Sequence, residues 1–102
     1  MRVLIFQTHE AQAKGLQHRP CIENDVLFVF PMVGPGDQFH SRNVKERFDL
    51  AFLSCDMVVL QKETVCPPHG TSVAPEGSFI AVEAKAGNLE AWGFEPGKRV
   101  SF

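Results

Sequence analysis

Short apolar runs, broken repeatedly by proline and glycine, constrain this chain more than any other feature. The run VLFVF at residues 26–30 is followed at once by PMVGPG, and MVVLQKETV is followed by CPPHGTSVAPEG. Short runs rich in β-branched and aromatic residues are typical of strands, and the continuously apolar 26–30 run favours a strand that is buried on both faces. Strands are expected at residues 2–7, 26–30, 38–44, 48–53, 57–65, 78–84 and 98–102. The loop at 66–77, with three Pro and two Gly, is expected to lack regular structure.

Two further segments favour short helices. Residues 9–18 (HEAQAKGLQH) contain good helix formers behind Thr8, which is a suitable N-cap, and Gly15 limits their length. Asn88 can cap the short segment LEAW, which Gly93 ends. With about six or seven short strands and two short helices, the sequence predicts an α+β fold, mostly β, built as a compact curled or barrel-like sheet.

Length and composition restrict the partners of such a chain. Its 102 residues leave room for one domain, residues 1–102. The net charge is −2, and no run of Lys or Arg forms a phosphate-binding stripe, so we expect no nucleic-acid partner. No segment approaches the roughly 20 apolar residues of a membrane span. MRVLIFQT is too brief for a signal peptide, so we expect no membrane partner and a cytoplasmic location, unless an N-terminal segment was removed.

Three segments carry a pattern found in a known family. GLQHRPCIENDVLFVF resembles Gly-Leu-Met-x-Arg, a spacer, and Gly-Met-Leu-Phe-x-Phe. HSRNVKERFDLAFL resembles Trp-Met-Lys-Asn-Thr-x-x-Pro-Leu-Asp-x-x-Phe, and FIAVEAKAG with GFEPGKRV resembles Leu-Glu-x-x-x-Gly with Gly-x-x-x-Gly-Asp-x-Val. From about Gly15 to Val100, in order and without large gaps, the chain therefore resembles domain of unknown function family 192.

This resemblance implies a small β-rich α+β fold and no established activity, and many relatives are exported. The family's Trp-Met pair falls on His40 and Ser41. The positions that keep the family pattern are Gly15, Leu16, Arg19, Arg42, Asn43 and Asp49. If the family shares a polar site, the resemblance implies that Arg42, Asn43 and Asp49 are what remains of it.

Asp49 stands at the point where a polar loop passes into an apolar strand. It shares a strand face with Ala51 and Leu53, because alternate side chains of a strand point to one side. A buried carboxylate needs a partner, and Arg19 or Arg42 could supply one as a bidentate pair. We therefore predict a fold-holding ion pair at Asp49. In the alternative, Arg42 and Asn43 hold a small polar or anionic ligand while Asp49 orients Arg42.

Other polar residues carry weaker signals. Cys66 and His69 are suitable metal ligands, but tetrahedral zinc needs two more, and nothing fixes the spacing to another Cys or His. We therefore expect no metal and no cofactor. The three Cys are odd in number and widely spaced, which does not indicate a disulfide framework. Glu83 alternates with buried positions and could pair with a basic residue.

The sequence contains no glycine-rich nucleotide loop, zinc-binding helix motif or Gly-x-Ser-x-Gly elbow. We therefore assign no catalytic residue and predict a non-enzymatic binding or accessory module. Two alternatives stay open. One is a hydrolase-type enzyme that uses Asp49 or the Cys66/His69 pair, and the other is a module that forms homodimers through exposed sheet edges. The predicted ligand-binding residues are Arg19, His40, Arg42, Asn43 and Asp49.

Overall fold

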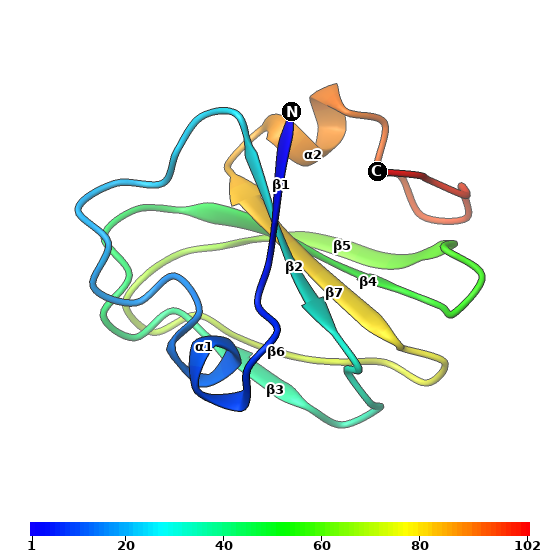
Figure 1. Cartoon of the computed structure of the whole chain (residues 1–102), viewed down its shortest axis with the longest axis horizontal. Coiled ribbons are helices and arrows are strands. Elements are labelled where there is room, and N and C mark those ends of the chain that lie inside the picture. The colour runs from blue at the N-terminus through cyan, green and yellow to red at the C-terminus, as the bar shows by residue number, and fades with distance from the viewer.

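A computed structural model describes the backbone of residues 1–102 and every side chain except that of His9 (Figure 1). In this described part the chain forms seven strands and two short helices. The strands are β1 (Arg2–Ile5), β2 (Val26–Pro31), β3 (Gln38–His40), β4 (Phe48–Leu53), β5 (Val59–Val65), β6 (Thr71–Val73) and β7 (Ile80–Lys85). The helices are α1 (His9–Lys14) and α2 (Asn88–Ala91). The predicted α+β fold, mostly β, is thus confirmed.

The strands form two sheets. The larger has the order β1-β2-β7-β4-β5, with β1 parallel to β2 and the other neighbours antiparallel. The smaller is the antiparallel pair of β3 and β6, which crosses below the larger sheet in the view of Figure 1. The sheets are curled but are not closed into a barrel.

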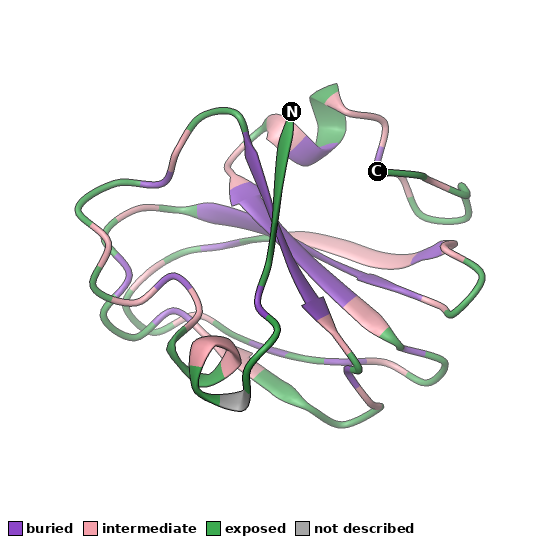
Figure 2. Cartoon of the chain, in the orientation of Figure 1, coloured by how far each residue is buried: buried purple, intermediate pink, exposed green. Residues whose placement is uncertain are grey.

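The centre of the larger sheet is buried on both faces, and this explains the continuously apolar sequence of β2. Phe28 and Phe30 face a first core, which α1 and the β3–β6 pair help to cover. Leu27 and Val29 face a second core, which contains Leu89 of α2. Figure 2 shows the buried residues concentrated along the central strands β2, β7 and β4. The prediction of a strand buried on both faces at 26–30 is therefore confirmed.

Several boundaries differ from those expected. The first helix ends at Lys14 rather than near residue 18, because Gly15 takes a positive φ of 53° and donates its N–H to the Ala11 carbonyl. Thr8 is the N-cap as predicted, and its hydroxyl accepts a hydrogen bond from the Ala11 N–H at 3.0 Å. The expected strand at 98–102 is reduced to a single bridge between Val58 and Arg99.

The Pro- and Gly-rich segment 66–77 contains a strand, so the prediction that it lacks regular structure is wrong. Thr71–Val73 inside it form β6, because their backbone pairs with β3. The strand expected at 38–44 keeps only residues 38–40, since the chain turns at Asn43, where φ is 61°. A strand can thus form inside a Pro- and Gly-rich segment where a neighbouring strand supplies its hydrogen bonds.

Candidate functional site

Asp49 makes a different set of contacts from the one that we predicted. Its carboxylate accepts hydrogen bonds from Thr64 Oγ1 at 2.9 Å, from the Gly87 N–H at 2.8 Å and from the Leu89 N–H at 3.2 Å. The predicted pairing with Arg19 or Arg42 is therefore wrong. On β4, Asp49 points to the sheet face that α2 covers, and the first N–H groups of a helix lack partners within the helix. Asp49 satisfies these groups and fixes α2 on the sheet.

The two candidate arginines lie elsewhere. Arg19 pairs with Glu23 at 3.0 Å and stacks over the Phe28 ring, with 4.8 Å between the guanidinium carbon and the ring centre. Arg42 is exposed, and within the described part its guanidinium forms no hydrogen bond or ion pair. Asn43, also exposed, donates from Nδ2 to Gln17 Oε1 at 3.3 Å. Within the described part, no hydrogen bond or ion pair thus joins Asp49 to Arg19 or Arg42, whereas His40 is bonded to the Arg42 N–H.

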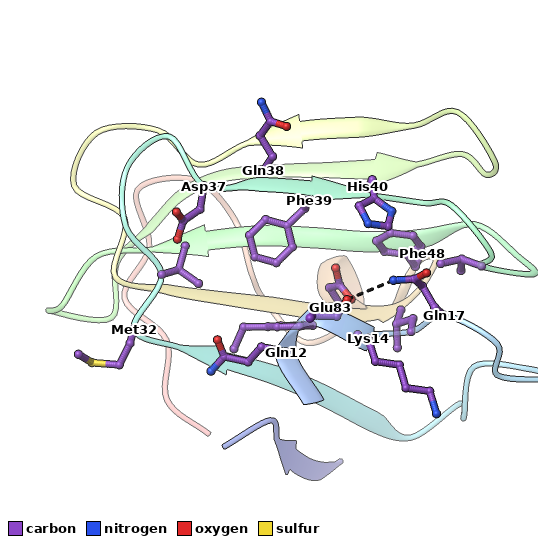
Figure 3. A pocket seen from close by; sticks show the side chains of 16 residues that line it. Gln12, Lys14, Gln17, Met32, Asp37, Gln38, Phe39, His40, Phe48 and Glu83 are labelled. Carbon is purple, nitrogen blue, oxygen red and sulfur yellow. Dashed lines mark hydrogen bonds between the residues drawn. The ribbon is translucent and has the colours of Figure 1, made fainter. Parts of the chain in front are cut away.

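A cavity of about 460 Å³ lies between α1 with its following turn, strand β3 and the first face of the larger sheet (Figure 3). Of the five predicted ligand-binding residues, His40 alone lines it. Its apolar walls are Leu16, Phe30, Val33, Val44, Phe39 and Phe48. The exposed residues Met32, Asp37 and Gln38 also line it, so the cavity is open to solvent on that side.

Glu83 lines the cavity, although it was not among the ligand-binding residues predicted from the sequence. It lies on β7 opposite Phe28 and Leu50 and is only 4% exposed, yet it lines the cavity. In the view of Figure 3 its carboxyl group lies lower than Phe39 and His40 and higher than Gln12 and Lys14. Within the described part of the chain, no donor forms a hydrogen bond with this carboxyl, so the predicted basic partner is not found there. Burial raises the pKa of Glu83 from 4.5 to about 8.

The polar groups around the cavity are mostly engaged. Gln12 Nε2 donates to the Phe6 carbonyl at 2.9 Å and to the Pro31 carbonyl at 3.3 Å. Gln17 Nε2 donates to the Ala13 carbonyl at 3.1 Å. The Nδ1 atom of His40 accepts from the Arg42 N–H at 3.2 Å, so in the neutral ring the proton is on Nε2. The bonds formed by His40 and Gln17 connect the exposed Arg42–Asn43 turn to the cavity wall.

The other chemical candidates lie apart from the cavity lining. Cys66 and His69 are exposed. The three cysteines, Cys21, Cys55 and Cys66, are free. Among the described side chains, no group of three or more His, Cys, Asp or Glu residues could hold a metal ion. In the same part of the chain, no helix combines the length and apolar character needed to cross a membrane.

Comparison with known proteins gives a family and a fold. The model of domain of unknown function family 192, described as "Uncharacterized ACR", matches residues 1–102. A crystal structure of a protein of unknown function from Novosphingobium aromaticivorans DSM 12444 is similar with a TM-score of 0.84 and 24% identity, over 100% of this chain and 75% of that chain. The comparison with curated proteins found no match.

A second crystal structure, of a protein from Sinorhizobium meliloti 1021 described as a candidate transcription regulator, has a TM-score of 0.82 and 20% identity. The similarity covers 95% of this chain and 78% of that chain. At these identities, the two structures show that the fold is shared.

Proposed function

The chain belongs to domain of unknown function family 192, which is described as uncharacterised, and we propose from its own geometry that it is a non-enzymatic binding module for a small ligand. The observation that carries this proposal is the buried Glu83 carboxyl group at the floor of an open cavity. A cavity of about 460 Å³ falls within the range of small-molecule sites, which are mostly apolar with a few placed polar groups. Burying a carboxyl without a partner is unfavourable, and a ligand that bonds to it would offset that cost.

The contacts and positions of the residues considered for catalysis, Asp49, Cys66 and His69, also support binding over hydrolysis. Asp49 uses its carboxylate to hold Thr64 and the first turn of α2 on the far face of the sheet. Cys66 and His69 are exposed and do not line the cavity. The proposed ligand site therefore includes His40 and Glu83, and it does not include Asp49.

The proposal can be tested by NMR screening of a fragment library against isotopically labelled protein. We expect binding fragments to shift the amide signals of Phe39, His40 and Glu83 together. Phe39→Ala removes one ring from the cavity wall and should weaken such binding at least about tenfold. Phe79→Ala removes a ring that is 41% exposed and outside the lining, and should leave binding unchanged. A screen in which no fragment shifts these three signals would refute the proposal.

A second candidate function is association of two copies through β1. Val3, Leu4 and Ile5 are each at least 40% exposed, and β1 is an end strand of the larger sheet. An exposed apolar end strand is a template for pairing with another chain, and a two-fold dimer is the commonest closed arrangement. Sedimentation equilibrium should then show a dimer that Leu4→Lys converts to a monomer. A monomeric wild-type chain at high concentration would rule out this association.

A further inference from the structure

We infer that the ligand is an organic cation, with its ammonium or guanidinium group at Glu83 and its hydrocarbon body among Phe30, Phe39 and Phe48. This inference rests on the proposed binding function and specifies its ligand class. It follows from three features of the cavity: the carboxyl group at its floor, the rings of its walls and the shortage of free donors.

The floor of the cavity carries acidic character. Glu83 is the one buried ionisable residue among the described side chains that line the cavity. The other ionisable residues of the lining are Lys14 on α1, Asp37 before β3 and His40 on β3, and these are exposed or half-buried. Figure 3 shows the Lys14 ammonium group directed away from Glu83. A ligand cation would therefore supply the charge partner that the lining does not.

One further acidic group, Glu63 of β5, lies on the same sheet face, with Leu50 of β4 between it and Glu83. Its carboxylate is already engaged by Ser72 Oγ at 2.7 Å and by Gln61 Nε2 at 2.6 Å. Arg19, which stacks on Phe28, is engaged by Glu23. Neither Glu63 nor Arg19 bonds directly to Glu83. The Glu83 carboxyl group is therefore where a ligand cation would be held.

The walls suit a cation with an apolar body. Phe30 and Phe39 are arranged edge to face, with ring centres 5.4 Å apart, and Phe48 completes the aromatic lining. Aromatic rings attract a cation through their negative faces, and this attraction is stronger where water is excluded. The same rings provide the apolar surface that a hydrocarbon body needs.

An anionic ligand, which we expected from the sequence, fits this cavity less well. The side-chain amide groups of Gln12 and Gln17 already donate to backbone carbonyls. At pH 8 and above, where half or more of Glu83 is ionised, its carboxylate would repel an anion beside it. The Oε1 atom of Gln12 carries no hydrogen bond from the described residues, so it offers an acceptor, which again suits a donor-bearing cation.

Binding of a cation at Glu83 is linked to proton release. Because the pKa of Glu83 is raised to about 8, its carboxyl is largely protonated at pH 6 in the empty cavity. The carboxyl must lose this proton to pair with a cation. The affinity for a permanently charged cation should therefore rise about tenfold per pH unit towards pH 8 and level off above it. The variant His40→Gln should keep this rise in affinity, because the rise is caused by the Glu83 carboxyl group and not by the His40 imidazole.

The test compares three probes of equal length and different charge: n-hexylammonium, n-hexanol and n-hexanoate. Isothermal titration at pH 8 should give at least about tenfold tighter binding of hexylammonium than of either other probe. Glu83→Gln, which keeps the shape and removes the charge, should abolish this preference. The matched control Glu76→Gln changes an exposed glutamate outside the lining and should preserve it.

The outcomes separate the inference from the proposed function. Equal or tighter binding of hexanol or hexanoate overturns the cation inference and leaves the binding function standing. The inference alone also fails if fragments bind the cavity but hexylammonium does not, or if Glu83→Gln keeps the preference. If neither fragments nor the three probes bind, both proposals are wrong.

Discussion

The Glu83 carboxyl group binds its proton more tightly in the folded chain than in the unfolded chain, because burial raises its pKa from 4.5 to about 8. The folded state therefore holds more protons between these two values, and stability falls as the pH rises through this window. The loss should be on the order of 5 kcal/mol, complete above about pH 8 and absent below about pH 4.5. Denaturant melts at pH 5, 7 and 8.5 measure it.

The variant Glu83→Gln should show little of this pH dependence and should be more stable than the wild type at pH 8.5. The exposed Glu76→Gln should keep the wild-type dependence. If Glu83→Gln falls in stability with pH as steeply as the wild type, Glu83 is not the responsible group.

Asp49 permits a second prediction on single residues. Asp49→Ala removes the acceptor of the Thr64 hydroxyl and of two backbone N–H groups, those of Gly87 and Leu89. Leaving such donors without partners should cost about 3 kcal/mol of unfolding free energy. Asp56→Ala, at an exposed turn position, serves as the control and should change the stability by less than about 0.5 kcal/mol. An unchanged denaturation midpoint for Asp49→Ala would show that it does not fix α2.

At the level of elements, β3 forms a wall of the cavity and pairs with β6, and the chain packs closely at Gly70, just before β6. The buried Ser41 hydroxyl accepts from the Gly70 N–H at 2.8 Å. A Cβ atom at Gly70 would lie 2.5 Å from Val65 Cγ1 and 2.9 Å from the Cys66 carbonyl oxygen. Gly70→Ala should therefore destabilise the chain by about 1–3 kcal/mol.

Gly70→Ala should also weaken ligand binding, because β3 carries Phe39 and His40 into the cavity wall. Gly34→Ala is the matched control, since nothing lies within 4 Å of its added Cβ. Thermal melts and fragment titrations of both variants test this. A Gly70→Ala variant as stable as Gly34→Ala would contradict the close packing at this position.

Local patterns of elements could be predicted from the sequence, and contacts between distant elements could not. The apolar run of β2 predicts burial on both faces, and Thr8 predicts the start of α1, since both signals are local. The partners of Asp49 are 15 to 40 residues away in sequence, and they depend on how β5 and α2 dock onto β4. The alternation around Glu83 indicated only that it could pair with a basic residue. The lack of a partner depends on the arrangement of α1 and β3 around it, which no short segment encodes.

For the whole molecule, stability should decrease from the centre of the larger sheet towards the cavity and the edge. The central strands β2, β7 and β4 lie between two cores, whereas β1 is exposed along its length and β3 pairs with β6 outside the larger sheet. Hydrogen exchange should therefore be slowest in β7 and β4, and faster in β1, β3 and β6.

A ligand held between α1 and β3 should reduce this difference, because it would link the cavity walls to the sheet at Glu83. Hydrogen exchange measured with and without a saturating ligand should show protection gained in β3 and in the turn after α1. It should show little change in β1, which does not line the cavity. Equal protection gained in β1 and β3 would instead indicate a general stabilisation of the chain, and the cavity would not be the site of binding.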